Sequence, residues 1–86
     1  MFEKEVVVKN ETGLHARPAS MLVELCNKYK SEIKILTAET EINPKSIISI
    51  LLGGVYKDTP IRVIVEGEDE EEAGNAICEL INSFEE

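Results

Sequence analysis

The residue types best suited to chemistry surround His15, the only histidine of the chain. Gly13 precedes it in a predicted loop, and Arg17 and Pro18 follow it closely. Because proline is tolerated in the first turn of a helix, where its missing N–H has no intrahelical partner, a helix is predicted to begin near Ala16. The N–H groups and the dipole at that end attract anions and disfavour an imidazolium. We therefore expect a neutral, nucleophilic His15 whose phosphoryl adduct would accept hydrogen bonds from the backbone of Ala16 and Arg17 and pair with the Arg17 side chain.

Simpler interpretations of the same residues stay open. Position alone supports a surface histidine without chemistry about equally well. A metal site is not expected, because one histidine and two cysteines give no ligand cluster. Cys26 and Cys78 fall on the apolar faces of predicted helices, which is typical of small core residues. No motif marks a Ser-His-Asp arrangement, and the acidic run 66–72 is typical of a helix start.

A second segment of interest begins at Ser46. This serine is a good N-cap for a short helix over Ile47–Leu52, and it is also a candidate phosphorylation site, because a helix start tolerates added negative charge. Apolar side chains nearly encircle that helix. Either they are all buried, or they leave an exposed apolar patch that docks another protein.

The elements expected to position these residues alternate in the order strand, helix, strand, strand, helix, strand, helix. Strands are predicted over 2–9, 33–36, 40–42 and 60–66, and helices over 16–29, 47–52 and from Asp69 to Phe84. The inward face of the last helix should carry Ala73, Ala76, Ile77, Leu80, Ile81 and Phe84. Asp69 and Glu72 predict a capping box, and Gly74 should cost about 1 kcal/mol relative to alanine. Together these elements favour an α+β fold, one antiparallel sheet with helices on one face.

Length and charge narrow the function classes. The 86 residues suffice for a single domain, residues 1–86. The net charge of −8 argues against a nucleic-acid binder. The charge is uneven, because residues 66–86 hold nine acidic residues and neither lysine nor arginine. No apolar stretch is long enough for a membrane span, the N-terminus does not resemble a signal peptide, and two cysteines fit a reducing, cytoplasmic environment.

The motifs together resemble a known family. The segment Glu11-Thr12-Gly13-Leu14-His15-Ala16-Arg17-Pro18-Ala19 is similar to the active-site signature of HPr, the histidine-containing phosphocarriers of the bacterial phosphoenolpyruvate-dependent sugar phosphotransferase system. Lys45-Ser46-Ile47, followed by Gly53-Gly54, resembles the family's regulatory signature, and 67–70 also resembles the family. The resemblance covers nearly the whole chain.

The resemblance implies an open-faced sandwich of four antiparallel strands and three helices, and a carrier rather than an enzyme, without cofactors. It implies that His15 accepts a phosphoryl group on Nδ1 from phosphorylated enzyme I and passes it to the cytoplasmic A domain of a sugar-specific enzyme II. Arg17 would stabilise the group, and Thr12 and Ala16 would line the site. The positions that would dock partners are Ser20, Ile47, Ile48 and Leu51. The relatives are mostly monomers.

Two positions raise further expectations. Ser46 matches a serine that an ATP-dependent HPr kinase/phosphorylase modifies in some relatives, where the product acts as corepressor with a LacI-type regulator. A mainly regulatory module and a carrier in a paralogous, nitrogen-related relay therefore remain alternatives. Glu24 lies on the same predicted helix face as Arg17, where relatives often carry a basic or neutral residue, so it should weaken docking to acidic partners. The chain also has Ala38-Glu39 in place of the family's Asn-Gly-like turn, and neither residue favours a positive φ.

Overall fold

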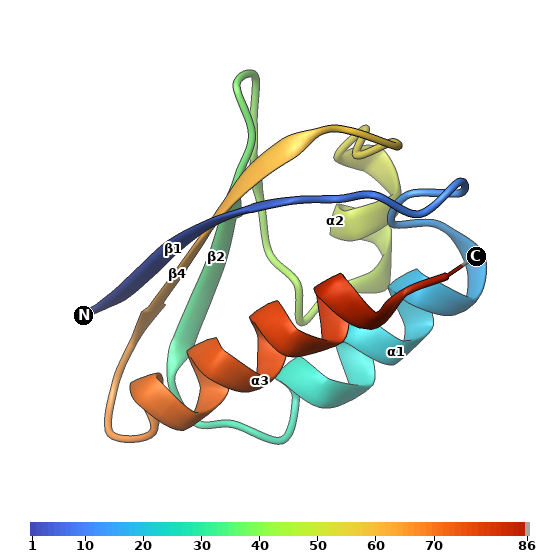
Figure 1. Cartoon of the computed structure of the whole chain (residues 1–86). Coiled ribbons are helices and arrows are strands. Elements are labelled where there is room, and N and C mark those ends of the chain that lie inside the picture. The colour runs from blue at the N-terminus through green and yellow to red at the C-terminus, as the bar shows by residue number, and fades with distance from the viewer. Residues whose placement is uncertain (86) are drawn as a thin grey trace.

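Four antiparallel strands form one sheet in the computed structural model, which describes residues 1–85. The strands are β1 (Phe2–Val7), β2 (Glu32–Leu36), β3 (Glu41–Ile42) and β4 (Pro60–Glu66), and the helices are α1 (Ala16–Cys26), α2 (Ile47–Leu52) and α3 (Glu70–Ser83). The spatial order of the strands is β1-β4-β2-β3. All three helices lie on one face of the sheet, and α1 and α3 run side by side (Figure 1). The predicted α+β sandwich with one open sheet face is confirmed.

Alternation along the strands separates the core from the open face of the sheet, because successive side chains point to opposite sides. The buried strand residues are Val6, Ile33, Ile35, Ile42, Ile61, Val63 and Val65. The open face is rich in charged side chains, and among them Arg62 and Glu3 form an ion pair at 3.2 Å. A shift of one residue in strand pairing would exchange these two sets, so burial of one face fixes the register.

Helix α1 begins at Ala16 as predicted but ends at Cys26, three residues earlier than the predicted Tyr29. The Asn27 side chain donates to the carbonyl oxygen of Val23 at 2.9 Å. The N–H groups of Lys28 and Tyr29 each bond to a carbonyl oxygen only three residues back. These shorter bonds tighten the last turn and end the helix.

The β2–β3 turn is built without a residue at positive φ at Ala38 or Glu39. Thr37 holds it instead: its N–H donates to the Thr40 carbonyl oxygen at 2.9 Å, and its hydroxyl oxygen accepts from the N–H groups of Glu39 and Thr40 at 3.1 and 3.0 Å. The Thr37 hydroxyl oxygen therefore stabilises this turn without the positive φ angles that an Asn-Gly turn uses.

The predicted capping box at the start of α3 is wrong. Asp69 makes no side-chain bond within its own helix. Its carboxylate accepts from the N–H groups of Lys30 and Ser31, both at 3.0 Å, and from the Ser31 hydroxyl. Those bonds lower the pKa of Asp69, the Ser31 hydroxyl most strongly. Asp69 thus ties the α1–β2 loop to α3.

The buried face of α3 is rotated from the predicted one. Ala73, Gly74, Ile77, Cys78 and Ile81 are buried, whereas the predicted core residues Ala76, Leu80 and Phe84 are only half-buried. The rotation presents Gly74 to the strand layer, where a Cβ atom would lie 2.3 Å from the Phe2 ring. A side chain at position 74 would therefore force the Phe2 ring to move. No helix in residues 1–85 is long and apolar enough to cross a membrane.

Replacing Gly74 with alanine is expected to destabilise the fold by about 1–3 kcal/mol through overpacking. This is the reverse of the gain of about 1 kcal/mol that the substitution gives at an open helix position. In a Phe2→Ala background the clash is gone, so Gly74→Ala should then be neutral or stabilising. Urea unfolding of the four proteins measures this; stabilisation in both backgrounds would contradict the packing argument.

The Asp69 contacts predict an acid-sensitive contribution to stability. Because the pKa of Asp69 is lowered in the folded state, the stabilisation is complete above the ordinary carboxyl pKa and is lost as the pH falls through the folded-state value. Asp69→Asn should therefore lower the melting temperature at pH 7, and its difference from the unaltered protein should shrink in acid below about pH 4. Asp58→Asn is the matched control, because asparagine tolerates the positive φ of Asp58. A constant difference at all pH values would refute this account.

Candidate functional site

The loop before His15 is folded by a buried asparagine. Asn10 is 4% exposed. Its side-chain N–H groups donate to the Gly13 carbonyl oxygen at 2.9 Å and to the Thr12 hydroxyl at 3.3 Å, while the Gly13 N–H donates to the Asn10 carbonyl oxygen at 3.1 Å. Asn10 was not among the predicted site residues. The sequence indicated only that a turn-forming residue stands at the start of this loop.

The end of this loop contacts the segment that follows α2. The N–H of Leu14 donates to the Val55 carbonyl oxygen at 3.1 Å. A Cβ atom on Gly13, whose φ is +64°, would lie 2.3 Å from that same oxygen and 2.7 Å from the Cα atom of Tyr56. Glycine is needed here both for its backbone conformation and for the close approach of these two segments of the chain.

This contact brings an aromatic ring to the histidine. The rings of His15 and Tyr56 are stacked, with centroids 5.5 Å apart and planes inclined by 24°. Tyr56 is 60% exposed and His15 is half-buried. Tyr56 was not among the predicted site residues, because only a contact across 41 positions of sequence places it there.

His15 occupies the N-cap of α1 in an extended conformation, with φ −127° and ψ 166°. Its imidazole makes no capping hydrogen bond, so the ring is left available for other chemistry. The next residue, Ala16, has a φ of +50°, a left-handed value that costs a non-glycine residue of order 1 kcal/mol. Pro18 is the third helical residue, so its predicted place in the first turn is confirmed.

The first turn of α1 favours an anion. The first turn of α1 contains no acidic residue, whereas the first turn of α3 contains Glu70, Glu71 and Glu72. The first N–H groups of any helix have no acceptor within it, and they carry the positive end of the dipole. Arg17 is exposed, and it lines a hollow with Met21 and residues 83–85 at the end of α3. Thr12 and Ala16 are exposed beside His15.

Ser46 lies at the N-cap of α2, as predicted, and its hydroxyl oxygen accepts from the Ser49 N–H at 3.3 Å. The neighbouring Lys45 ammonium donates to the carbonyl oxygens of Tyr29 and Ser31 at 2.9 and 3.0 Å. These bonds place the Ser46 segment at the C-terminal end of α1. His15 is at the other end of that 11-residue helix, about 16 Å away along its axis.

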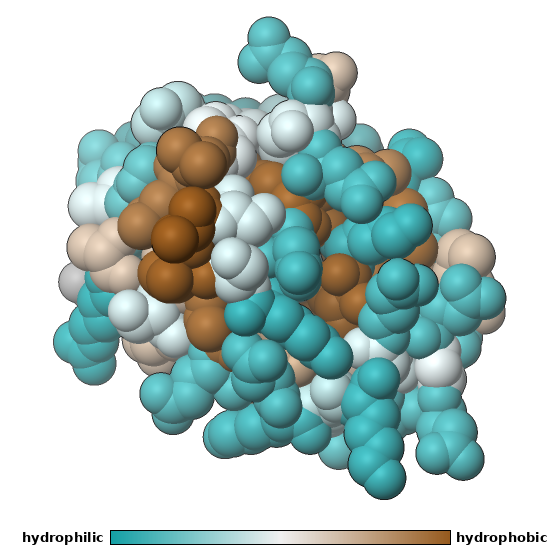
Figure 2. Space-filling view, turned by 180° about the vertical axis from the view of Figure 1, so that it is seen from behind, coloured by the Kyte–Doolittle hydropathy of each residue, from teal (hydrophilic) through white to brown (hydrophobic). Residues whose placement is uncertain are grey.

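The apolar side chains of α2 are mostly exposed. Ile50 is fully buried, but the α2 patch, defined as Ile47, Ile48, Leu51 and Leu52, has exposed fractions of 38%, 66%, 41% and 81%. Figure 2 shows apolar side chains gathered on the side of the molecule that carries α2. Of the two interpretations of this helix, the exposed patch is the one observed. Ser20 and Glu24 are exposed on α1.

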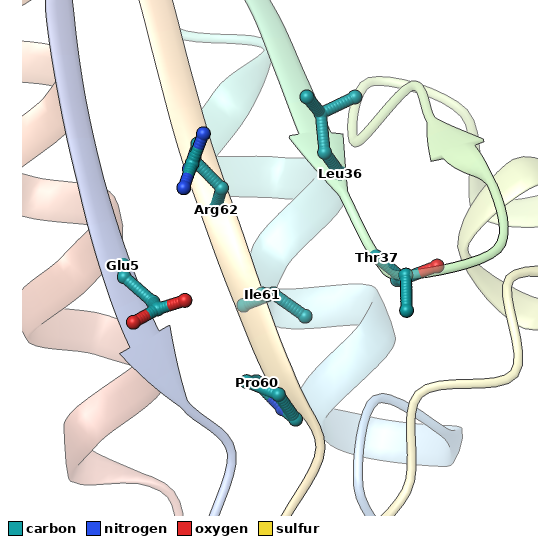
Figure 3. A pocket seen from close by; sticks show the side chains of 7 residues that line it. Glu5, Leu36, Thr37, Pro60, Ile61 and Arg62 are labelled. Carbon is teal, nitrogen blue, oxygen red and sulfur yellow. The ribbon is translucent and has the colours of Figure 1, made fainter.

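Other features are separate from His15. A shallow hollow lies on the open sheet face, where Glu5, Arg62 and Leu36 form one row across three strands (Figure 3).

Cys26 and Cys78 are buried free thiols, and burial raises the pKa of Cys26 to about 12. Residues 1–85 contain no group of three or more histidine, cysteine, aspartate or glutamate side chains that could hold a metal ion.

Comparison with known proteins agrees with this fold. The family model described as "PTS HPr component phosphorylation site" matches residues 2–83. The phosphocarrier protein HPr of Mycoplasma pneumoniae is 47% identical over 86 residues, which cover 99% of this chain and 98% of the relative. The crystal structure of HPr-C-His from Thermoanaerobacter tengcongensis has a TM-score of 0.93 at 41% identity, covering 96% of this chain and 93% of that one. A crystal structure of an HPr dimer from the same organism has a TM-score of 0.76 at 41% identity, covering 96% and 95%. The chain therefore belongs to the HPr family, the phosphocarriers of the phosphotransferase system.

Proposed function

We propose that this chain carries a phosphoryl group on His15, from phosphorylated enzyme I to the cytoplasmic A domain of a sugar-specific enzyme II. The observation that carries the proposal is the position of the only histidine, at the N-cap of a helix whose first turn lacks acidic residues. The matched family is itself described by a phosphorylation site, which supports the assignment. The chain then acts in the cytoplasm as a carrier, not as an enzyme, and needs no cofactor.

The transfer step requires only a nucleophile and positioned donors. The lone pair on Nδ1 of His15 forms the bond to phosphorus while the bond from phosphorus to the donor's leaving atom breaks, and the donor keeps that electron pair. The positive charge then resides on the ring and the negative charge on three phosphoryl oxygens. The backbone at the start of α1, the Arg17 guanidinium and the Thr12 hydroxyl supply hydrogen-bond donors for those oxygens. Because Thr12, Ala16 and Arg17 are exposed, water competes for the same phosphoryl oxygens, which lets the group leave again.

The surface around α2 is where we place the partners. The α2 patch offers apolar contacts, and Ser20 and Glu24 extend the surface along α1. Exposed apolar patches of this kind mark protein-docking sites. The same face would serve enzyme I and the enzyme II domain in turn, because both must reach His15.

Ser46 supports a second, regulatory role. Its hydroxyl is half-buried at the N-cap of α2, where a phosphate would replace the present bond to Ser49. It also adjoins the α2 patch, so a charge there would alter docking. An HPr kinase/phosphorylase and a LacI-type regulator are the partners for this role. Transfer to non-sugar acceptors would instead indicate the nitrogen-related relay.

Labelling experiments test both roles. Incubation with phosphoenolpyruvate and enzyme I should place one acid-labile phosphate on the chain, and His15→Ala should accept none, because its nucleophile is missing. Ser46→Ala should label normally in that arm. With ATP and HPr kinase/phosphorylase, the label should be acid-stable, absent from Ser46→Ala and present in His15→Ala. Normal labelling of His15→Ala by enzyme I would refute the carrier role of His15.

Glu24 tests the placement of the docking surface. Glu24→Lys removes a negative charge that faces acidic partners, so it should tighten binding to enzyme I by about two- to fivefold at low salt. Calorimetric titration measures the affinity. Glu32→Lys makes the same charge change on β2 and should leave the affinity nearly unaltered. Equal strengthening by both variants would indicate a general charge effect and would contradict the placement.

A further inference from the structure

Tyr56 is an exposed aromatic residue whose position the carrier proposal does not by itself explain. It does not belong to the α2 patch, and it forms no part of the core, since 60% of its surface is accessible. Its ring nevertheless lies over the one imidazole of the chain, at 5.5 Å and a shallow angle of 24°. An exposed tyrosine stacked on a nucleophile is a candidate positioning residue.

The Tyr56 backbone is fixed on both sides. On one side, the Leu14 N–H binds the carbonyl oxygen of Val55, and Gly13 lies directly against Tyr56. On the other side, the Tyr56 N–H donates to the Thr59 hydroxyl at 3.1 Å, and the Thr59 N–H donates back to the Tyr56 carbonyl oxygen at 3.1 Å. These bonds fix the backbone from which the phenol ring reaches His15, and none of them involves the imidazole.

The stack limits the rotation of the imidazole. The Nδ1 lone pair lies in the plane of the ring, so the orientation of that plane sets the direction from which phosphorus must approach. No hydrogen bond from the cap holds the imidazole, as described above. The face of Tyr56 resists rotation of the imidazole, because turning the ring edge-on would break the stack.

We infer that Tyr56 is a positioning residue for phosphoryl transfer, which orients the His15 ring for in-line attack. This inference rests on the proposed carrier function. In the step, Nδ1 forms the bond to phosphorus, the bond to the donor's leaving atom breaks with its electron pair, and Nε2 keeps its proton. Tyr56 takes no part in bond making; it reduces the number of orientations that the nucleophile explores before attack.

Two substitutions at this exposed position separate ring stacking from apolar contact. Tyr56→Phe keeps the aromatic face, whereas Tyr56→Leu keeps apolar bulk but removes the ring. Because the chain has a single histidine, its imidazole protons give unambiguous NMR signals. Tyr56→Leu should shift both signals downfield by removing the ring current, and Tyr56→Phe should leave them close to their original positions.

Rates of phosphorylation then test the role in transfer. The probes are enzyme I with phosphoenolpyruvate, and phosphoramidate, a small donor that makes no docking contacts. Tyr56→Leu should slow labelling of His15 about two- to tenfold with both donors, the range expected from one stacked pair. Tyr56→Phe should label at the original rate with both.

The outcomes are distinguishable. A loss confined to the enzyme I arm would show that Tyr56 contacts the partner, and it would overturn the positioning role. Unaltered imidazole signals in Tyr56→Leu, or an unaltered rate with both donors, would overturn it as well. If the unaltered protein accepted no phosphate on His15, the carrier function itself would fail, and this role with it; the NMR signals would still report whether the stack exists.

Discussion

One backbone contact determines the arrangement of the site: the approach of residues 13–14 to residues 55–56. The hydrogen bond from Leu14 to Val55 and the absence of a side chain at Gly13 let two loops touch that are far apart in sequence. That contact holds the loop that leads into α1, whose N-cap is His15, and it brings Tyr56 beside the imidazole. Any side chain at position 13 would disturb all of these at once.

The structure uses its helix starts in two opposite ways. The first turn of α3 is filled with carboxylates; Glu70 among them bonds the N–H of Gly67 and the amino terminus. The first turn of α1 has none, and its N-cap side chain makes no bond to the helix. Acidic residues of the last 21 positions are thus concentrated at the start of α3, away from the start of α1. For this reason the chain can have a net charge of −8 and still contain a helix start that suits an anion.

Sequence patterns predicted most of the fold, because the strands and helices bury apolar side chains at the period of their own element. The start of α1 was predictable because Pro18 tolerates few other positions. The wrong prediction for Asp69 and the overlooked residues have another origin. Asp69 was expected to cap its own helix, but Lys30 and Ser31, about 40 residues away, compete for its carboxylate. Tyr56 meets His15 through a contact between segments 41 positions apart, which local spacing does not indicate. Asn10 has a local signal as a turn-forming residue, but its burial and its bonds to Thr12 and Gly13 appear only in the folded chain.

The strand order has a consequence for the behaviour of the protein in a crowded solution. With the order β1-β4-β2-β3, the exposed edges are β1 and β3. β3 has only two residues, and β1 carries Glu3, Lys4 and Glu5 in succession. Short or charged edges are poor templates for pairing with another chain. The sheet can therefore leave one face uncovered while its edges resist the strand-to-strand addition that leads to aggregation.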